Sequence, residues 1–435
     1  MSKRNRDLAG MDPNSQLLHQ PDLLAHLLAS WLPLVDFIRL ASLNREWRSA
    51  LSDGEAACWE ALLRRDFCEE ATRRRQRQRQ ARISTAQLYR HIWQGRGNWR
   101  LGRSFPPVRP SPRANGLLLL NDADVVAEIG AFDDVIRVWQ AVTTQSNKSI
   151  VLNNLGSATP SSSGDDTSAA NRAVIDAALS DGPDNLNVAG GGLNGAWIQR
   201  VALGEDESTE RTRLGGSEHK PIYHVVRDSR TVAASVSGSA EDLLLWDANR
   251  PDTVLFKANS FGFGDAIGLH ILSIGTDHRI SLVFPSGQMV DVDVREGKSR
   301  VRTFVEHSLQ AGLSSPIQAS AVSPTSRVLA TSRCCLSYDT RYLSESIVSF
   351  DQAAVTWSMR NVSSLVVVNE RTTVAGIKDG WQGPIVVLND DGSSRRIIYS
   401  QERYYRVLGL RANASLLAAT CTDHTRLFGF SPPLL

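Results

Sequence analysis

Two acid–imidazole pairs come nearest to chemistry in this sequence. Asp277 precedes His278 and Asp423 precedes His424, and a carboxylate beside an imidazole can orient a general acid or base. Both pairs fall at the same position of a repeated unit, so a role in forming a turn accounts for both. The nine histidines form no HExxH pattern, and the sequence has no GxSxG, GxxxxGK[ST] or dinucleotide-binding fingerprint. We therefore expect a non-catalytic protein.

Glycine and cysteine residues give no further sign of a cofactor or metal site. Gly190–Gly192 lies in a polar β-rich region, without the strand-to-helix context that phosphate binding needs. The adjacent Cys334 and Cys335 lie in a strand-like stretch, where buried thiols are expected. The five cysteines are an odd number and include no CxxC pair, so we expect no disulfide framework, no zinc site and a reducing cytoplasmic and/or nuclear location.

Length and charge indicate more than one domain. The 435 residues suggest two or three domains, or one large repeat domain with a small one. Residues 1–110 hold 19 Lys and Arg against 11 Asp and Glu, a balance of +8, whereas the remainder holds 29 against 35, a balance of −6. The longest apolar runs are too short to span a bilayer, and no apolar segment follows the basic N-terminus. We expect neither a membrane segment nor a secretory signal.

The N-terminal region is predicted to be helical. Residues 1–15 are polar and predicted to be disordered, and 16–68 are predicted to form short apolar helices. Leu24, Leu28 and Leu32 recur on one helical face. Pro33 ends that helix and Asp36 is placed to cap the next. So many apolar side chains on so few residues must be buried against another surface.

A basic segment follows these helices. Residues 69–97 are predicted to form a linker helix, because the Arg- and Gln-rich run at 69–83 has good helix propensity. A nuclear-localisation or nucleic-acid role is the alternative. No aromatic residues interleave with the run, as a single-strand binding surface would need, so we expect a solvated face and no nucleic-acid partner.

From residue 98 onward the sequence predicts an all-β domain built from repeats. Apolar residues followed by small ones recur at Val126, Val188, Val232, Leu272, Leu329, Val374 and Leu417. Their separations are 62, 44, 40, 57, 45 and 43 residues, and four of the six lie near the length of a four-stranded repeat unit. This pattern predicts a β-propeller, most simply with seven blades. The polar stretch at about 143–185 is predicted to be a disordered insertion.

A second pattern places an acidic residue five positions before a large apolar one. The pairs are Asp134 and Trp139, Glu241 and Trp246, Asp277 and Leu282, and Asp423 and Phe428. The acid is expected to accept hydrogen bonds from free amides in a tight turn, with the next strand following. The resemblance to WD repeats is partial, because only Trp246-Asp247 preserves the dipeptide and no Gly-His pair opens a repeat.

Residues 21–67 resemble the F-box motif. The matching positions are Pro21, Leu24, Leu28, Trp31, Leu32, Asp36, Phe37, Leu40, Leu43, Arg45, Trp47, Trp59 and Phe67. Gln20 and Leu23 differ from the residues that are usual in the family. Independently, Asn98-Trp99-Arg100-Leu101-Gly102 is similar to the segment that joins the linker helix to the first blade in F-box/WD-repeat proteins.

The resemblance implies a substrate receptor of an SCF-type (cullin-RING) ubiquitin ligase. In that family the F-box binds the Skp adaptor and the propeller binds a protein substrate, which can be phosphorylated. By position, the adaptor-binding residues would be Pro21, Leu24, Leu28, Leu32, Val35, Phe37 and Leu40. Trp47 and Trp59 are expected in the F-box core instead. The fold class is therefore α+β multidomain, a small helical F-box domain plus an all-β propeller.

Two alternatives stay open on the sequence alone. The N-terminal helices could form a self-contained cap, and the chain could be a scaffold without a link to a ligase. The substrate-binding residues are not readable. A phosphate-binding face needs several converging arginines, and the candidates are scattered over the repeats: Arg137, Arg200, Arg279, Arg341, Arg371 and Arg426.

Overall fold

The computed structural model describes most of the C-terminal three quarters of the chain and part of the N-terminal quarter. The described residues are Arg39, 58–67, 83–110, 116–130, 135–144, 149–158, 174–180, 186–201, 211–228, 230–274, 277–293, 298–303, 316–323, 326–331, 335–339, 347–350, 362–369, 371–377, 384–389, 393–396, 406–422 and 424–431. They belong to two compact units: unit 1, Met1–Gly97 with Ser431–Leu435, and unit 2, Asn98–Phe430. None of the described helices is long and apolar enough to cross a membrane.

The described part of unit 1 is helical. Residues 58–67 are α-helical, and helix α7 spans Thr85–Arg100. A capping box starts α7, because the Ser84 amide donates to Gln87 Oε1 (2.8 Å) and the Gln87 amide donates to Ser84 Oγ (3.3 Å). Tyr89 of α7 packs against Trp59 and Phe67, with ring centroids 5.7 and 5.0 Å apart. Trp59 is buried, as the sequence predicted.

A polar contact at the edge of this core fixes the two helices in register. Tyr89 donates its hydroxyl proton to Asp66 Oδ2 over 2.6 Å. The guanidinium of Arg96 lies 4.6 Å from the centre of the Phe67 ring. The Arg65 guanidinium also holds Asp66, with Nε 2.6 Å from Oδ1. The core of unit 1 is therefore aromatic inside and charged at its rim.

Two glycines inside α7 differ in the space around them. A Cβ added to Gly97 would meet nothing within 4 Å, whereas one added to Gly95 would lie 2.6 Å from Ser431 Oγ. We expect Gly97→Ala to stabilise α7 by about 0.5–1 kcal/mol, because alanine loses less backbone entropy in a helix. Gly95→Ala should give less than this. Amide hydrogen exchange of α7 measures both, and equal gains from the two variants would contradict the structure.

A glycine in the left-handed region ends α7. Gly102 has φ +63°. Its amide donates to the Trp99 carbonyl (3.0 Å), and the Arg103 amide donates to the Asn98 carbonyl (2.9 Å). This is a Schellman motif, in which glycine carries the positive φ. The motif explains why a glycine follows the helix at residue 102.

The last turn of α7 and the residues after it contact the last sheet of unit 2. Trp99 stacks on Phe430 at a centroid distance of 3.6 Å, and Asn98 donates to the Phe430 carbonyl. Val108 then pairs antiparallel with Leu427. Asn98–Gly102 lies between the helix and sheet 1 along the chain, and Asn98 and Trp99 contact its C-terminal end; that it joins the helix to a first blade stays a prediction. The predicted boundary between residues 97 and 98 coincides with the boundary between the two units, although α7 itself continues to Arg100.

Unit 2 consists of antiparallel sheets whose strands follow one another in chain order. Sheet 1 contains β1 (Gly116–Leu120), β2 (Val125–Gly130), β3 (Ile136–Thr144) and β4 (Ser149–Ala158). Sheet 2 contains β5 (Val174–Leu179), β6 (Asn187–Gly192), β7 (Gly195–Arg200) and β8 (Arg211–Arg213). Sheet 3 contains β9 (Ile222–Arg227), β10 (Thr231–Val236), β11 (Glu241–Asp247) and β12 (Arg250–Asn259). Sheet 4 contains β13 (Gly268–Ile274), β14 (Asp277–Val283), β15 (Gln288–Asp293) and β16 (Lys298–Thr303).

The remaining sheets repeat this order. Sheet 5 contains β17 (Ile317–Val322), β18 (Ser326–Thr331), β19 (Cys335–Asp339) and β20 (Ile347–Phe350). Sheet 6 contains β21 (Val362–Asn369), β22 (Thr372–Ile377), β23 (Ile385–Asn389) and β24 (Ser394–Arg396). Sheet 7 contains β25 (Val407–Ala412), β26 (Leu416–Cys421) and β27 (Thr425–Gly429), and Val108 bridges to the free edge of β27.

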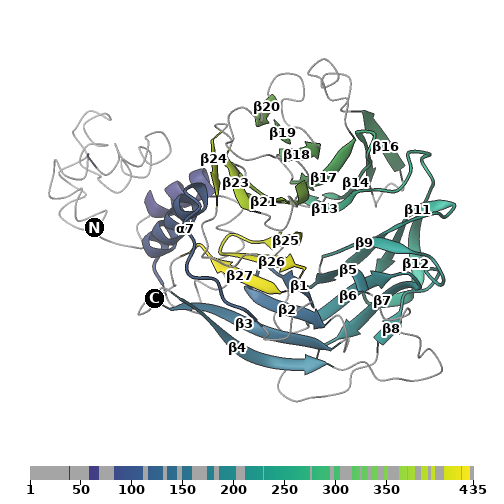
Figure 1. Cartoon of the computed structure of the whole chain (residues 1–435), viewed down its shortest axis with the longest axis horizontal. Coiled ribbons are helices and arrows are strands. Elements are labelled where there is room, and N and C mark those ends of the chain that lie inside the picture. Colours follow the sequence, from purple (N-terminus) through teal and green to yellow (C-terminus); the bar gives the residue numbers. More distant parts are fainter. Residues whose placement is uncertain are drawn as a thin grey trace, which may run out of the picture. The chain divides into compact units, whose positions relative to one another are not determined.

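The first strands of the seven sheets contact one another in a closed cycle. β1 contacts β5, and the contacts continue through β9, β13, β17, β21 and β25 back to β1. In Figure 1 the yellow strands of sheet 7 accordingly lie beside the blue strands of sheet 1. The two ends of unit 2 therefore meet, and each first strand has a first strand on either side.

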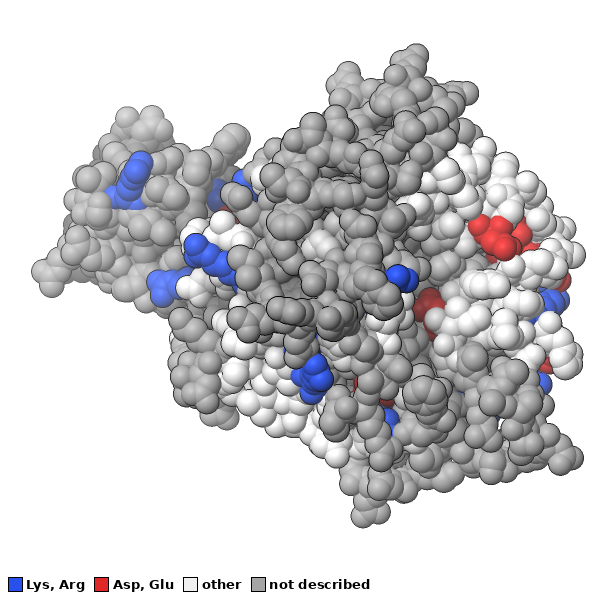
Figure 2. Space-filling model, viewed as in Figure 1, with Lys and Arg blue, Asp and Glu red and all other residues white. Residues whose placement is uncertain are grey.

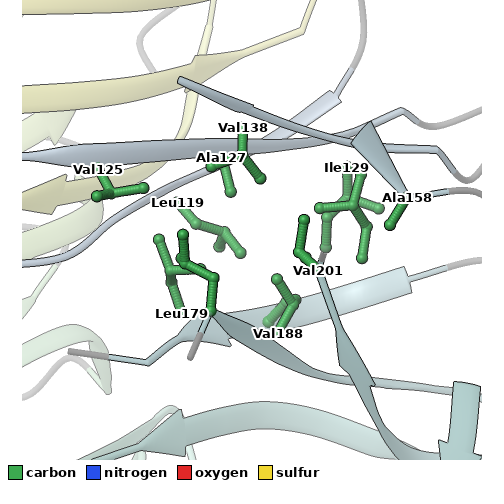
Figure 3. Close-up of a cluster of buried hydrophobic side chains, with 12 residues drawn as sticks. Leu119, Val125, Ala127, Ile129, Val138, Ala158, Leu179, Val188 and Val201 are labelled. Carbon is green, nitrogen blue, oxygen red and sulfur yellow. The ribbon is translucent and has the colours of Figure 1, made fainter. Parts of the chain in front are cut away.

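The hydrophobic core lies between neighbouring sheets. Between sheets 1 and 2, side chains from β1, β2 and β3 face side chains from β5 and β6 (Figure 3). The members labelled in the figure are Leu119, Val125, Ala127, Ile129, Val138, Ala158, Leu179, Val188 and Val201. Each fully buried Val or Leu contributes about 1.5–3 kcal/mol, so contact between sheets stabilises the unit.

Three details of the predicted repeats were wrong. Leu272 lies in β13, a first strand, whereas the other six apolar repeat positions lie in second strands. Asp277 and Leu282 both lie in β14, so Asp277 is part of the strand and does not lie in a turn before it. The predicted disordered insertion is wrong for β4 and β5, because β4 pairs with β3 through residues such as Ile150 and Leu152, and β5 pairs with β6. Residues 159–173 lie outside the described residues.

Candidate functional site on the first strands

A repeated polar contact joins the first strands of neighbouring sheets. The third residue of one first strand meets the fourth residue of the next. The instances are Asp176 Oδ2 with the Val225 amide (3.0 Å), His270 Nε2 with Ser320 Oγ (3.0 Å) and Ser364 Oγ with the Leu410 amide (3.0 Å). Neighbouring first strands therefore lie side by side in the same direction, with corresponding residues near one another.

Asp176 is the centre of this cluster. Its Oδ1 accepts a hydrogen bond from Arg411 Nη2 over 2.7 Å, although the two residues belong to sheets 2 and 7. Sheet 1 lies between those sheets in the cycle, so the ion pair links two first strands that are not neighbours in the cycle. His224 Nδ1 lies 3.9 Å from Asp176 Oδ2. The Asp176 end of the ion pair is mostly buried, because this side chain is only 14% exposed. The Arg411 end is in contact with solvent, because that side chain is 39% exposed.

Two neutral imidazoles complete the cluster. His224 Nε2 lies 3.2 Å from the Ala266 carbonyl oxygen, which only accepts, so Nε2 carries the proton. Burial lowers the pKa of His224, opposed by the Asp176 carboxylate and reinforced by the Arg411 charge. Burial also lowers the pKa of His270, to about 3, and the positive charges of Arg411 and Arg327 add to the effect. Both side chains are therefore uncharged at neutral pH.

These shifts predict a loss of stability in acid. The unfolded chain takes up a proton at His270 below about pH 6.5, whereas the folded protein does so only near pH 3. Stability from this group is therefore present above pH 6.5 and falls as the pH drops from 6.5 toward 3, by at most roughly 2–3 kcal/mol at pH 4.5. Urea unfolding of the wild type and His270→Gln at pH 7 and pH 4.5 measures this. The wild type should lose more stability between the two pH values, and equal losses would contradict the lowered pKa.

The start of the first strands carries a second repeated feature. In five of the seven sheets, a register shift leaves the second residue of the first strand without a partner in the second strand. These bulged residues are Ile175, Tyr223, Gln318, Ser363 and Leu408. β1 and β13 pair without a shift at this position. A β-bulge turns the side chain of the bulged residue away from the hydrogen-bonded ladder. The second residue is therefore distorted in the same way in five of the seven first strands.

Three of these bulged side chains are large, apolar and exposed. Ile175 is 37% exposed, Tyr223 42% and Leu408 49%. They come from sheets 2, 3 and 7, and each lies one residue before the third-position layer that contains Asp176 and His224. We call Ile175, Tyr223 and Leu408 the apolar rim, and Asp176, Arg411 and His224 the polar floor.

The adaptor-binding residues predicted from the sequence lie outside the described residues. This holds for Pro21, Leu24, Leu28, Leu32, Val35, Phe37 and Leu40, and for Trp47. The assignment of these residues stays a prediction. In the described part of the N-terminal region, Trp59 and Phe67 are buried against α7 and make no exposed surface.

The structure does not place the predicted arginines on first strands. Arg137, Arg200, Arg279 and Arg426 lie in β3, β7, β14 and β27, Arg371 lies in the turn after β21, and Arg341 is outside the described residues. The first strands carry Arg227 on β9 and Arg411 on β25 instead, which the sequence analysis missed. On the face in Figure 2 the described Lys and Arg side chains are scattered rather than gathered into one patch.

The histidine, cysteine and glycine residues first considered for chemistry do not lie together in one site. His424 is buried at the start of β27 and Cys335 is buried in β19, whereas Asp423 and Cys334 lie outside the described residues. Gly190 and Gly191 lie in β6, where an added Cβ would be 2.2 Å from the Trp197 ring and 2.3 Å from Ile222. Gly190 therefore leaves room for the Trp197 side chain within sheet 2, and Gly191 permits close packing of sheets 2 and 3. Among the described residues, no group of three His, Cys, Asp or Glu side chains is placed to hold a metal ion.

No protein-family model matches this chain, and no curated protein sequence matches it.

Proposed function

We propose that this chain is the substrate-recognition subunit of an SCF-type E3 ubiquitin ligase. Its N-terminal helices bind a Skp-type adaptor through Pro21, Leu24, Leu28, Leu32, Val35, Phe37 and Leu40, and its β domain is a seven-bladed propeller that binds the target protein. The role is non-catalytic: the chain holds the target near a ubiquitin-conjugating partner. The location that fits this role is cytoplasmic and/or nuclear.

The cyclic contact of the first strands is the observation that carries the propeller assignment. Seven antiparallel sheets of similar strand order, whose first strands contact one another in a closed cycle, support this assignment, because a seven-bladed propeller would have the same arrangement. Val108 pairs with Leu427 on the free edge of β27, so a residue from before sheet 1 supplements the three-stranded sheet 7. This pairing supports ring closure between the two ends of the domain, which leaves few open strand edges.

The order of parts along the chain supports the ligase assignment. Helical residues 58–67 and α7 precede the β domain. The segment Asn98–Gly102, which resembles the family's joining segment, has a physical role at each of three positions. Asn98 and Trp99 bond the last sheet, and Gly102 ends the helix. These contacts couple the end of the helix to the closure of the β domain.

Affinity purification of the full chain tests the proposal. We expect the wild type to co-purify a Skp-type adaptor and a cullin, and Leu28→Asp combined with Leu32→Asp to lose both, because two of the proposed apolar adaptor contacts become charged. Leu255→Asp is the matched control, since Leu255 is exposed on β12. A double variant that retains the adaptor, or a wild type that never binds it, would rule out the proposed docking.

A scaffold protein without a ligase link is the alternative function. The Arg- and Gln-rich run at 69–83 favours this alternative in a nucleic-acid-associated complex. It predicts co-purification of the same partners by the wild type and the Leu28→Asp, Leu32→Asp variant, with no cullin among them. The same purification therefore separates the two functions.

A further inference from the structure

We infer that the apolar rim and polar floor form a docking surface for an unphosphorylated, apolar segment of the target protein. This inference rests on the proposed function for the identity of the ligand as a target protein. The surface itself is argued from the described residues of the first strands.

The bulges set the position of the rim. Ile175, Tyr223 and Leu408 occupy one register position, and each is skipped where its strand pairs with the second strand. Ser363, the bulged residue of sheet 6, donates its hydroxyl to the Val407 carbonyl over 2.6 Å, next to Leu408. The starts of the first strands in sheets 6 and 7 are therefore adjacent. One repeated distortion presents the three apolar side chains at the same end of the cycle.

Exposure of these side chains is unfavourable unless a partner covers them. Large apolar and tyrosine side chains that are partly exposed in a cluster are typical of the centre of a protein interface. Each could instead have been paired within the sheet, as Leu117 and Leu269 are at the same position of β1 and β13. In sheets 2, 3 and 7 the second residue of the first strand is therefore unpaired within the sheet, and its apolar side chain is exposed.

The charges of the polar floor indicate which ligand charge the surface can accommodate. Arg411 of the polar floor, on the first strand of sheet 7, forms a 2.7 Å ion pair with Asp176 on the first strand of sheet 2. His224 donates to Ala266 and is uncharged. The positive and negative charges of the pair cancel, so the complementary ligand is uncharged. A phosphopeptide site would need several cations that converge on phosphate oxygens, and here the carboxylate of Asp176 would repel a phosphate.

Two peptide libraries test the ligand class on the immobilised full chain. One library has leucine or phenylalanine fixed at two central positions among Gly, Ser, Asn, Thr and Ala, and the other has phosphoserine fixed at the centre. The chain is used as the wild type, as Leu408→Ser with Tyr223→Ser, and as the control Leu255→Ser, which removes an equally exposed leucine from β12. Thermal unfolding of each variant checks that the fold is kept, since exposed substitutions usually change stability little.

We expect the wild type and Leu255→Ser to retain the apolar library about tenfold better than the rim variant, because two central anchors dominate such binding. Preferential retention of the phosphoserine library, equal retention by the rim variant, or retention of neither library would overturn the inference. Adaptor binding is measured on the same samples. If the chain binds the adaptor but no apolar peptide, only this inference is wrong. If it binds the peptide but not the adaptor, the docking surface is supported and the proposed ligase function is wrong.

Discussion

Trp99→Ala is expected to lower the free energy of unfolding of unit 2 by about 3–5 kcal/mol, the usual cost of removing a buried tryptophan. Trp99 is 1% exposed and stacks on Phe430 with the ring planes 9° apart. Its Nε1 donates to the Ala414 carbonyl over 3.1 Å. The substitution removes the stacking and leaves that carbonyl without this donor. It also weakens the contact that holds the chain before sheet 1 against sheet 7.

Urea unfolding followed by circular dichroism of the β-sheet signal measures this loss. Trp93→Ala is the matched control, because Trp93 lies on the same helix and is 56% exposed. Its effect should stay within about 0.5 kcal/mol. If the two tryptophan variants unfold at the same urea concentration, Trp99 does not stabilise the closure in the way described.

Arg327→Ala is expected to cost about 3–5 kcal/mol, because it leaves a buried carboxylate without its cation. Arg327 Nη2 lies 3.1 Å from Asp291 Oδ2, and the two side chains are 5% and 7% exposed. The pair joins β18 of sheet 5 to β15 of sheet 4. Ser281 donates a hydrogen bond to the other Asp291 oxygen, which satisfies part of the carboxylate but does not neutralise it.

A double variant separates the pair's charge from its packing. Arg327→Met with Asp291→Leu removes both charges and fills the space with apolar atoms, so most of the lost stability should return. Lys220→Ala is the control for an ion pair at the surface. Lys220 Nζ lies 3.1 Å from Glu241 Oε2, where both side chains are more exposed, and its loss should cost at most about 1 kcal/mol. A double variant as unstable as Arg327→Ala would contradict this account.

The repeat pattern could be predicted because second strands are buried on both faces. Val126, Val188, Val232, Val374 and Leu417 are all 0% exposed. Sheet 4 was misread because its second strand, β14, carries Arg279 at a register position where the other second strands carry valine or alanine. The apolar-small pair of sheet 4 was therefore assigned to β13, one strand too early.

A turn signal lies between the first and the second strands. Asn121, Asp228 and Asn413 directly follow a first strand and Asn369 ends one, and each side chain accepts hydrogen bonds from amides two to four residues later. These Asx turns are a sequence signal that could have set the register of the repeats. The predicted turn acid Glu241 instead accepts from Ser239 Oγ and Lys220 Nζ.

The candidate site was not predicted because its residues are far apart in the sequence. Asp176 and Arg411 are separated by 235 positions and meet only when the first and last sheets adjoin. Once the first strands are aligned, Asp176, His224, His270 and Ser364 share the third position. Polar residues at a shared position of otherwise apolar strands are the signal that could have found them. The capping box at Ser84 and Gln87 could likewise have placed the start of α7.

Titration of the purified full chain with a purified Skp-type adaptor tests the central claim most directly. We expect a one-to-one complex with a Kd of roughly micromolar or tighter, and no measurable binding by the Leu28→Asp, Leu32→Asp variant. Hydrogen exchange of α7 should be the same in both proteins, which shows that the described part of unit 1 is intact. Absence of binding by the wild type, or equal binding by the variant, would contradict the proposal that residues 21–40 dock this chain on a ligase adaptor.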